Sequence, residues 1–219
     1  MKRFLASAVI SLVGSLLSAQ GLAGGDFIRL VRTGSPDLVL GAIKAGADVM
    51  ARDETGVTPL MSASRVNPDP QVVRVLVKAG ANVEDRDALG FTPLMWASGE
   101  NKSADVVKAL LAEGANVMDR SRDGQTSLLR SANSNASPEV LRMLLTAGAD
   151  VNDSDSTGMT ALMLAAMANT NPVIVRLLLE AGADAKKANI FGKTAFDYAV
   201  DNRNLKGTSA YWALNNASY

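Results

Sequence analysis

The sequence contains neither cysteine nor histidine. Without cysteine the chain cannot form a disulfide, offer a thiolate nucleophile, build a cysteine zinc site or carry a lipid on a thiol. Without histidine it lacks the commonest general base at neutral pH, the commonest metal ligand and the central member of a serine triad. Most familiar hydrolase chemistry is therefore excluded, and we expect neither a cofactor nor a metal site.

An excess of either charge is also missing. The 219 residues include 22 Lys and Arg against 22 Asp and Glu, which gives a formal net charge of zero. Proteins that bind nucleic acid usually carry a clear basic excess, so we expect no nucleic-acid partner. The hydrophobic share of 47 % and the charged share of 20 % are ordinary for a soluble globular domain.

A long apolar run occurs only at the N-terminus, where residues 1–23 have the order of a secretory signal. A basic start at residues 1–3 precedes a mostly apolar stretch over 4–17, and small residues follow it. A membrane-spanning helix needs about 20 apolar residues, so a cleaved signal is favoured over an uncleaved anchor. Cleavage is expected after Ala23, with Ala19 as the alternative. The mature chain would then be exported, to the periplasm or out of the cell, without membrane insertion.

Three sets of residues recur with a step of 34 residues, as from Gly56 to Gly90. The first set consists of glycines: Gly56, Gly90, Gly124, Gly158 and Gly192. Threonines follow two residues after each of them: Thr58, Thr92, Thr126, Thr160 and Thr194. The third set consists of glycines that precede alanine: Gly46, Gly80, Gly114, Gly148 and Gly182.

Each set has a physical role in a unit of two helices. The first glycines suit a tight turn that needs positive φ. The threonines suit the N-cap of a first helix, and in Thr58-Pro59 a proline occupies the first helical position. A second cap and proline, as in Asp69-Pro70, begins a second helix, which the third glycines end.

These residues resemble ankyrin repeats. The resemblance is carried by Gly-Val-Thr-Pro-Leu at 56–60, Gly-Phe-Thr-Pro-Leu at 90–94 and Ala-Gly-Ala-Asp-Val at 45–49 and 147–151. It covers essentially the whole chain after the signal and implies an all-α solenoid of helix pairs joined by hairpin-like turns. The tetratricopeptide repeat also has a period of about 34 residues, but its Trp, Leu-Gly and Tyr pattern does not recur here.

The sequence departs from the ankyrin pattern in two respects. Ankyrin repeats usually have about 33 residues, and we place the extra residue in the loop between the two helices, as in 65–68. The histidine expected after Thr-Pro-Leu is also replaced, so apolar contact should take the place of any hydrogen bond between repeats. The residues at this position are Met61, Met95, Leu129, Met163 and Asp197.

One continuous solenoid is predicted over 24–219. A partial N-terminal unit and a polar C-terminal capping unit are expected, because each repeat buries its face only against its neighbours. The units are 24–52, then the full repeats 53–86, 87–120, 121–154 and 155–188, then 189–219.

Residues that bind a partner should occupy positions that differ between repeats and face outward, because positions that are alike in every repeat form the scaffold. The resemblance implies that turn tips and first helices form a concave surface that binds another protein. The candidates for binding a partner are Leu89, Phe91, Trp96, Arg122, Gln125, Arg130, Met159 and Leu164. Aromatic residues and arginine commonly anchor interfaces, so the hypothesis is a patch centred on Phe91, Trp96, Arg122 and Arg130. In the alternative, the two aromatic side chains fold down onto the next repeat.

Two weaker patterns have simpler explanations. Arg52, Arg86 and Arg120 also recur and could form a basic stripe, but a charge network between repeats is favoured. The run 153–158 imitates the start of a calcium loop, yet the bidentate Glu needed at the twelfth position is replaced by Leu164.

The sequence therefore favours a monomeric, non-catalytic module that binds another protein. An enzyme that uses turn carboxylates such as Asp153 and Asp155 is the second hypothesis, disfavoured because no apolar pocket is expected to raise their pKa. A purely structural spacer is the third, and it predicts that turn-tip side chains can be replaced without consequence.

Overall fold

The computed structural model describes residues 24–101, 103–134 and 137–218. The expected signal, with its cleavage after Ala23 or Ala19, lies outside the described residues. Within them the chain forms twelve helices: α2 (Gly24–Leu30), α3 (Pro36–Lys44), α4 (Pro59–Val66), α5 (Pro70–Lys78), α6 (Pro93–Glu100), α7 (Ala104–Ala112), α8 (Ser127–Asn133), α9 (Pro138–Thr146), α10 (Ala161–Ala168), α11 (Pro172–Glu180), α12 (Ala195–Ala199) and α13 (Ser209–Ala217).

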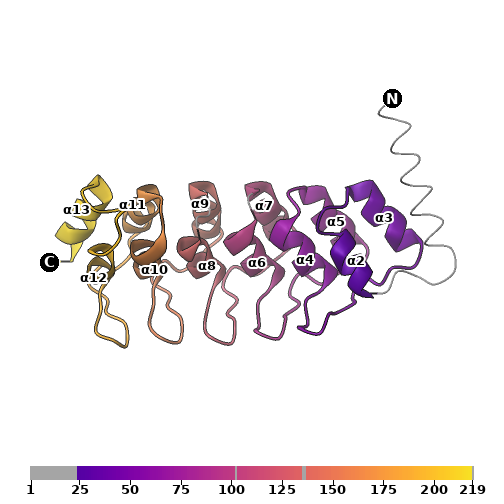
Figure 1. Ribbon diagram of the computed structural model, residues 1–219, viewed down its shortest axis with the longest axis horizontal. Coiled ribbons are helices and arrows are strands. Elements are labelled where there is room, and N and C mark those ends of the chain that lie inside the picture. Colours follow the sequence, from indigo (N-terminus) through magenta and orange to yellow (C-terminus); the bar gives the residue numbers. More distant parts are fainter. Residues whose placement is uncertain (1–23, 102, 135–136, 219) are drawn as a thin grey trace, which may run out of the picture.

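The helices form two parallel rows (Figure 1). The first helices, α2, α4, α6, α8, α10 and α12, contact one another in order, and the second helices, α3 to α13, do the same. Hairpin loops project from the first row on one side of the molecule. The predicted all-α solenoid is confirmed, and the β-structure of the described residues is limited to an isolated bridge between Ser154 and Thr160.

Local signals in the sequence explain where the helices begin. The side chains of Thr58, Thr92, Thr126 and Thr160 each accept a hydrogen bond from a backbone N–H in the first turn of a first helix. Ser35, Asp69, Ser137 and Asn171 cap second helices in the same way, whereas Ser103 makes no side-chain cap bond.

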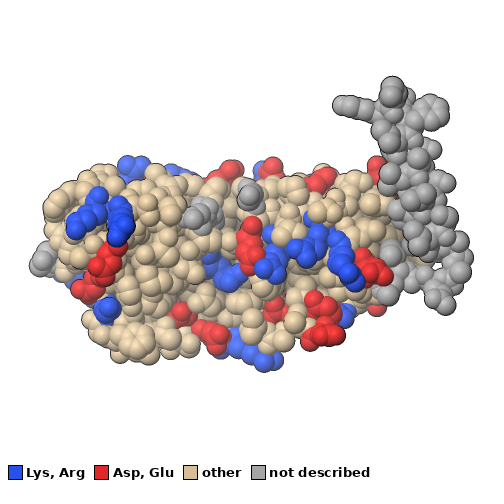
Figure 2. All heavy atoms as spheres, viewed as in Figure 1, with Lys and Arg blue, Asp and Glu red and all other residues tan. Residues whose placement is uncertain are grey.

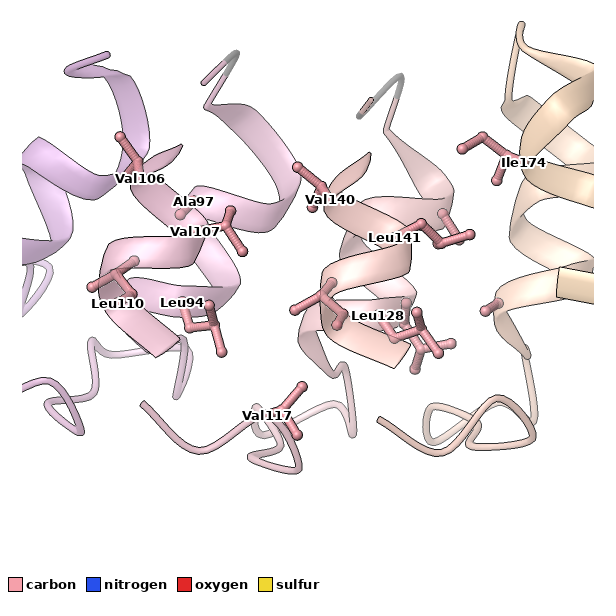
Figure 3. Close-up of a cluster of buried hydrophobic side chains, with 14 of the residues drawn as sticks. Leu94, Ala97, Val106, Val107, Leu110, Val117, Leu128, Val140, Leu141 and Ile174 are labelled. Carbon is pink, nitrogen blue, oxygen red and sulfur yellow. The ribbon is translucent and has the colours of Figure 1, made fainter. Parts of the chain in front are cut away.

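Equivalent leucines of successive repeats fill the space between the two rows (Figure 3). On the first helices Leu60, Leu94, Leu128 and Leu162 are at most 1 % exposed. The position where ankyrin repeats have histidine is fully buried in Met61, Met95, Leu129 and Met163. Apolar contact thus replaces a polar link at these four positions, as the sequence predicted. The fifth, Asp197, departs from that expectation, because its carboxylate is exposed and accepts hydrogen bonds from the amide and hydroxyl of Thr194.

Buried asparagines connect each repeat with the one before it. Asn67, Asn101, Asn169 and Asn202 occupy the connections between first and second helices and are at most 7 % exposed. Each side chain donates two hydrogen bonds to backbone carbonyls of the preceding unit and accepts one from the amide two residues later. The equivalent residue of the third full repeat, Asn135, lies outside the described residues.

Backbone hydrogen bonds also connect each hairpin with the next. The amide of Ser156 donates to the carbonyl of Asp123 at 2.9 Å, and the same bond recurs between the other neighbouring hairpins. This close approach needs glycine: Gly124 has φ +76°, and a Cβ there would lie 3.0 Å from the Ser156 nitrogen. Gly148, which ends α9, has φ +96° but no atom within 4 Å of an added Cβ.

Replacing these two glycines separates strain from steric conflict. Gly148→Ala is expected to lower the free energy of unfolding by about 1 kcal/mol, because only the left-handed conformation penalises it. Gly124→Ala is expected to lower it by about 2 kcal/mol or more, because its Cβ also presses on the next hairpin. Urea denaturation followed by circular dichroism measures both values. Equal losses in the two variants would contradict tight hairpin stacking.

Candidate functional site

Four side chains from three successive repeats meet on the first helices. Arg65, Phe91, Trp96 and Arg130, together the aromatic–arginine cluster, belong to α4, the loop before α6, α6 and α8. The Phe91 and Trp96 rings meet edge to face with centroids 5.3 Å apart. The Arg65 guanidinium carbon lies 4.6 Å from the Trp96 centroid, and that of Arg130 lies 4.7 Å from Phe91 and 5.3 Å from Trp96. Such contacts combine ring quadrupoles with positive charge.

Two carboxylates hold this cluster in place. Trp96 donates from Nε1 to Oδ2 of Asp87 at 3.0 Å, while the other oxygen of Asp87 accepts from the Phe91 amide. Glu100 joins two arginines, with Arg65 Nε at 2.6 Å and Arg130 Nη2 at 3.3 Å. The rings and guanidiniums are therefore preorganised, and little rotamer freedom remains to be lost on binding.

The Arg130 side chain is more enclosed than that of Arg65, with 22 % of its surface exposed against 47 %. Burial lowers the pKa of its guanidinium, and the neighbouring Glu100 opposes this change. Its Nε is buried and has no hydrogen-bond partner among the described residues. Gly99 makes room for it, since a Cβ at that position would lie 3.0 Å from this nitrogen. Arginine stays protonated in proteins, so the cluster holds two positive charges beside one Glu100 carboxylate.

The remaining predicted residues do not all join this cluster. Leu89 is 56 % exposed on its hairpin tip, and Arg122 is exposed on the next tip, where its amide donates to the Leu89 carbonyl. Gln125 is half-buried and donates to Asp155 at 3.0 Å. Of the four residues at the centre of the predicted patch, the structure brings Phe91, Trp96 and Arg130 together. It places Arg122 on a hairpin tip instead.

Two predicted contact residues are buried instead. Met159 is 8 % exposed and accepts a hydrogen bond on its sulfur from Asn189, and Leu164 is 5 % exposed in the hydrophobic core. The expectation that their side chains face outward is wrong, because Met159 contacts Asn189 of the next unit and Leu164 lies in the hydrophobic core. We leave them out of the surface proposed below.

Phe91 and Trp96 each remain half-buried. Their contacts with Arg130 show that they partly cover the next repeat, as the alternative predicted. Each nevertheless keeps exposed surface.

The recurring arginines form the charge network that the sequence favoured. Arg52 donates to the Gly56 and Arg86 carbonyls at 3.0 Å and pairs with Asp85 at 2.6 Å. Arg86 repeats the pattern with Asp119, and Arg120 repeats it with Asp153. The guanidiniums are thus engaged between repeats.

A groove of about 580 Å³ adjoins the aromatic–arginine cluster on its N-terminal side. Its wall residues include Ile28, Arg29, Arg32, Met61, Arg65 and Trp96. Figure 2 shows Lys and Arg side chains in a band over the first helices of the N-terminal half, where α2, α4, α6 and α8 lie in Figure 1. Arg29 and Arg32 were not predicted from the differences between repeats, because they lie in the partial first unit, where the turn and Thr-Pro-Leu signals are absent.

Other kinds of site find no support in the described part of the chain. Its acidic side chains do not gather into groups that could hold a metal ion. None of its helices has the length and apolar character needed to cross a membrane.

The stacked helix pairs and the hairpins that project from them define a repeat solenoid. A family model described as ankyrin repeats (three copies) matches residues 27–121 and 128–209, so the chain belongs to the ankyrin-repeat family. No curated protein matches the chain. Ankyrin repeats are a module of protein–protein interaction, which agrees with a surface of partly exposed aromatic and arginine side chains.

Proposed function

We propose that this chain is a non-catalytic, monomeric module that binds another protein, in the periplasm or outside the cell. The contact surface consists of the hairpin tips and the first helices, with the aromatic–arginine cluster at its centre. The observation that carries the proposal is this cluster, since two aromatic rings held between two guanidiniums form a rigid, partly exposed anchor. Interface hot spots are enriched in the same residue types.

The carboxylates of the enzyme hypothesis already have structural partners. Asp153 pairs with Arg120, and Asp155 accepts hydrogen bonds from the amides of Thr157 and Met159. The ion pair joins two neighbouring hairpins and the two amide bonds shape a single hairpin, which is a sufficient reason for acidic residues there. A binding module explains the partly exposed aromatic–arginine cluster, whereas neither the enzyme nor the spacer hypothesis gives it a role.

Export rests on the order of residues 1–23, with a basic start, an apolar stretch and small residues before Ala23. Fractionation of expressing bacteria, followed by N-terminal sequencing, tests it. A periplasmic or secreted product that begins at Gly24 or Gln20 is expected. A cytoplasmic product that retains Met1 would contradict it.

Partner capture tests the surface. The purified protein is immobilised and incubated with envelope or culture extract, and the triple variant Phe91→Ala, Trp96→Ala, Arg130→Ala is run beside it. We expect the variant to capture at least tenfold less of the partner, because truncated hot-spot residues commonly cost about 2 kcal/mol or more.

A matched triple variant controls for surface changes in general. Lys78, Lys108 and Arg142 are exposed on the second helices α5, α7 and α9, so their replacement by alanine should leave capture unchanged. Circular dichroism confirms helix content in both variants. A partner held equally by the parent and by the folded cluster variant would contradict the proposed surface.

A further inference from the structure

The groove beside the aromatic–arginine cluster, hereafter the N-terminal groove, has charged side chains of opposite sign on its two edges. Arg29 and Arg32 come from α2 and the turn after it, and Arg65 comes from α4. Asp53 and Glu54 line the groove from the first hairpin. Arg52 lines the groove beside them, but its guanidinium is paired with Asp85. One edge therefore carries arginines and the other carries two carboxylates, in a protein whose total charge is zero.

The arginines of this groove differ in how much of their hydrogen-bonding capacity is used. Arg52 has both terminal nitrogens engaged within the network between repeats. Arg65 pairs with Glu100 through Nε, and its two terminal nitrogens have no partner among the described residues. Arg32 is exposed, and its side chain likewise has no ion pair or hydrogen bond to the described part of the chain.

Arg29 is available as well. Its contact with Asp26 is 3.2 Å long, and its side chain is 76 % exposed. A pair of this kind is screened by water and contributes little, so a partner carboxylate can replace Asp26. Arg29, Arg32 and Arg65 thus keep free or exchangeable donors along one edge of a single groove.

The floor between the two edges is apolar. Ile28 and Met61 lie beneath it, and Trp96, fixed by Arg65 on one face, forms its far wall. Stacking on Trp96 also orients the Arg65 guanidinium, which suits the planar, two-point recognition of a carboxylate.

We propose that the N-terminal groove binds an extended acidic segment of the partner protein. Carboxylates of the segment bind Arg32 and Arg65, and an apolar side chain of the segment lies against Trp96. This inference rests on the proposed function and narrows it to one chemical class of partner. Charge complementarity carries it, since the groove presents arginines with open donors along one edge.

A nucleic acid fits the same groove less well. Asp53 and Glu54 would repel a phosphate backbone along the opposite edge, and Trp96 is the lone aromatic side chain among the wall residues that the structure describes. A peptide can place its acidic side chains on one edge alone, because successive side chains of an extended strand point to opposite sides.

A peptide library tests the charge preference without a known partner. The purified full-length protein is used to select from random dodecapeptides displayed on phage, and enrichment of Asp and Glu is expected. The charge-reversed variant Arg32→Glu, Arg65→Glu should lose this enrichment and favour Lys and Arg instead. The variant Lys108→Glu, Arg142→Glu, on the second helices, should select the same acidic peptides as the parent.

Tryptophan fluorescence then places the peptide in the groove. Trp212 is 56 % exposed on α13, at the far end of the solenoid, so Trp212→Phe leaves Trp96 as the single tryptophan. A selected acidic peptide should change the Trp96 emission, and Arg32→Ala or Arg65→Ala should each weaken its binding about tenfold. The corresponding peptide with Gln and Asn in place of Glu and Asp should bind at least tenfold more weakly.

The outcomes separate this inference from the proposed function. Selection without charge bias, or the same acidic peptides selected by Arg32→Glu, Arg65→Glu, would overturn the acidic-segment proposal. So would a twelve-nucleotide oligothymidine that binds more tightly than the peptides and depends on the same arginines. If the cluster variant loses partner capture while Arg32→Glu, Arg65→Glu retains it, the binding module stands and the acidic groove does not.

Discussion

Replacing Leu128 with alanine is expected to lower the free energy of unfolding by about 3–5 kcal/mol. Leu128 is 1 % exposed on α8, and this helix contacts α6, α9 and α10 (Figure 3). The change removes apolar contacts and leaves a cavity in the middle of the solenoid, where neighbours on both sides prevent collapse. Urea denaturation followed by circular dichroism at 222 nm measures the loss.

Leu89→Ala is the matched control, because it makes the same chemical change at a side chain that is 56 % exposed. We expect it to alter stability by about 0.5 kcal/mol or less. The m-value, which is the slope of the free energy of unfolding against urea concentration, provides a second result. Each repeat is stabilised by its neighbours, so a cavity in the middle of the solenoid can uncouple the unfolding of its two halves and lower the m-value. A loss below about 1 kcal/mol for Leu128→Ala would contradict a continuous core through α8.

The solenoid could be predicted from the sequence because its signals are local and repeat. Thr58 and its equivalents act as N-caps through their hydroxyls, and Gly124 and its equivalents adopt positive φ, which the absence of a Cβ permits. The Arg52, Arg86 and Arg120 set was also interpreted correctly, because pairs of opposite charge recur with the same step. Because these residues recur in the full repeats, the structure predicted for one repeat applies to the others.

The candidate site could be predicted only in part. Phe91, Trp96 and Arg130 meet as expected, whereas Arg65 and Glu100 were missed because their contacts depend on how neighbouring repeats stack. Leu164 is equivalent to Trp96 and Arg130, but its apolar side chain packs into the core. Comparison between repeats detects variation, and burial decides whether a variable residue is available to a partner.

The buried asparagines show the same limit. Asn67, Asn101, Asn135 and Asn169 recur with the step of 34 residues, so the set was visible in the sequence. Its role was not, because the side chains of Asn67, Asn101 and Asn169 bond to carbonyls of the preceding repeat, which are remote in sequence. Asparagine followed two residues later by a helix N-cap is the local sign of this link, as in Asn101-Lys102-Ser103.

Asn169→Ala is expected to lower the free energy of unfolding by about 3 kcal/mol. The side chain is fully buried, and its Nδ2 donates to the carbonyls of Ala132 and Ser134 at 3.0 and 2.8 Å. Its Oδ1 accepts from the amide of Asn171, the N-cap residue of α11. Alanine leaves three backbone groups without their partner, and a buried polar group without a hydrogen bond is destabilising.

Two further variants isolate the cause of that loss. Asn133→Ala changes an exposed asparagine at the end of α8 and should alter stability by about 0.5 kcal/mol or less. Asn169→Asp keeps the shape and the acceptor but removes both donors and directs a carboxylate toward two carbonyls. At pH 7 it should therefore be at least as destabilising as alanine. If Asn169→Asp retained parental stability in urea denaturation, packing rather than the paired hydrogen bonds would hold successive repeats together at this position.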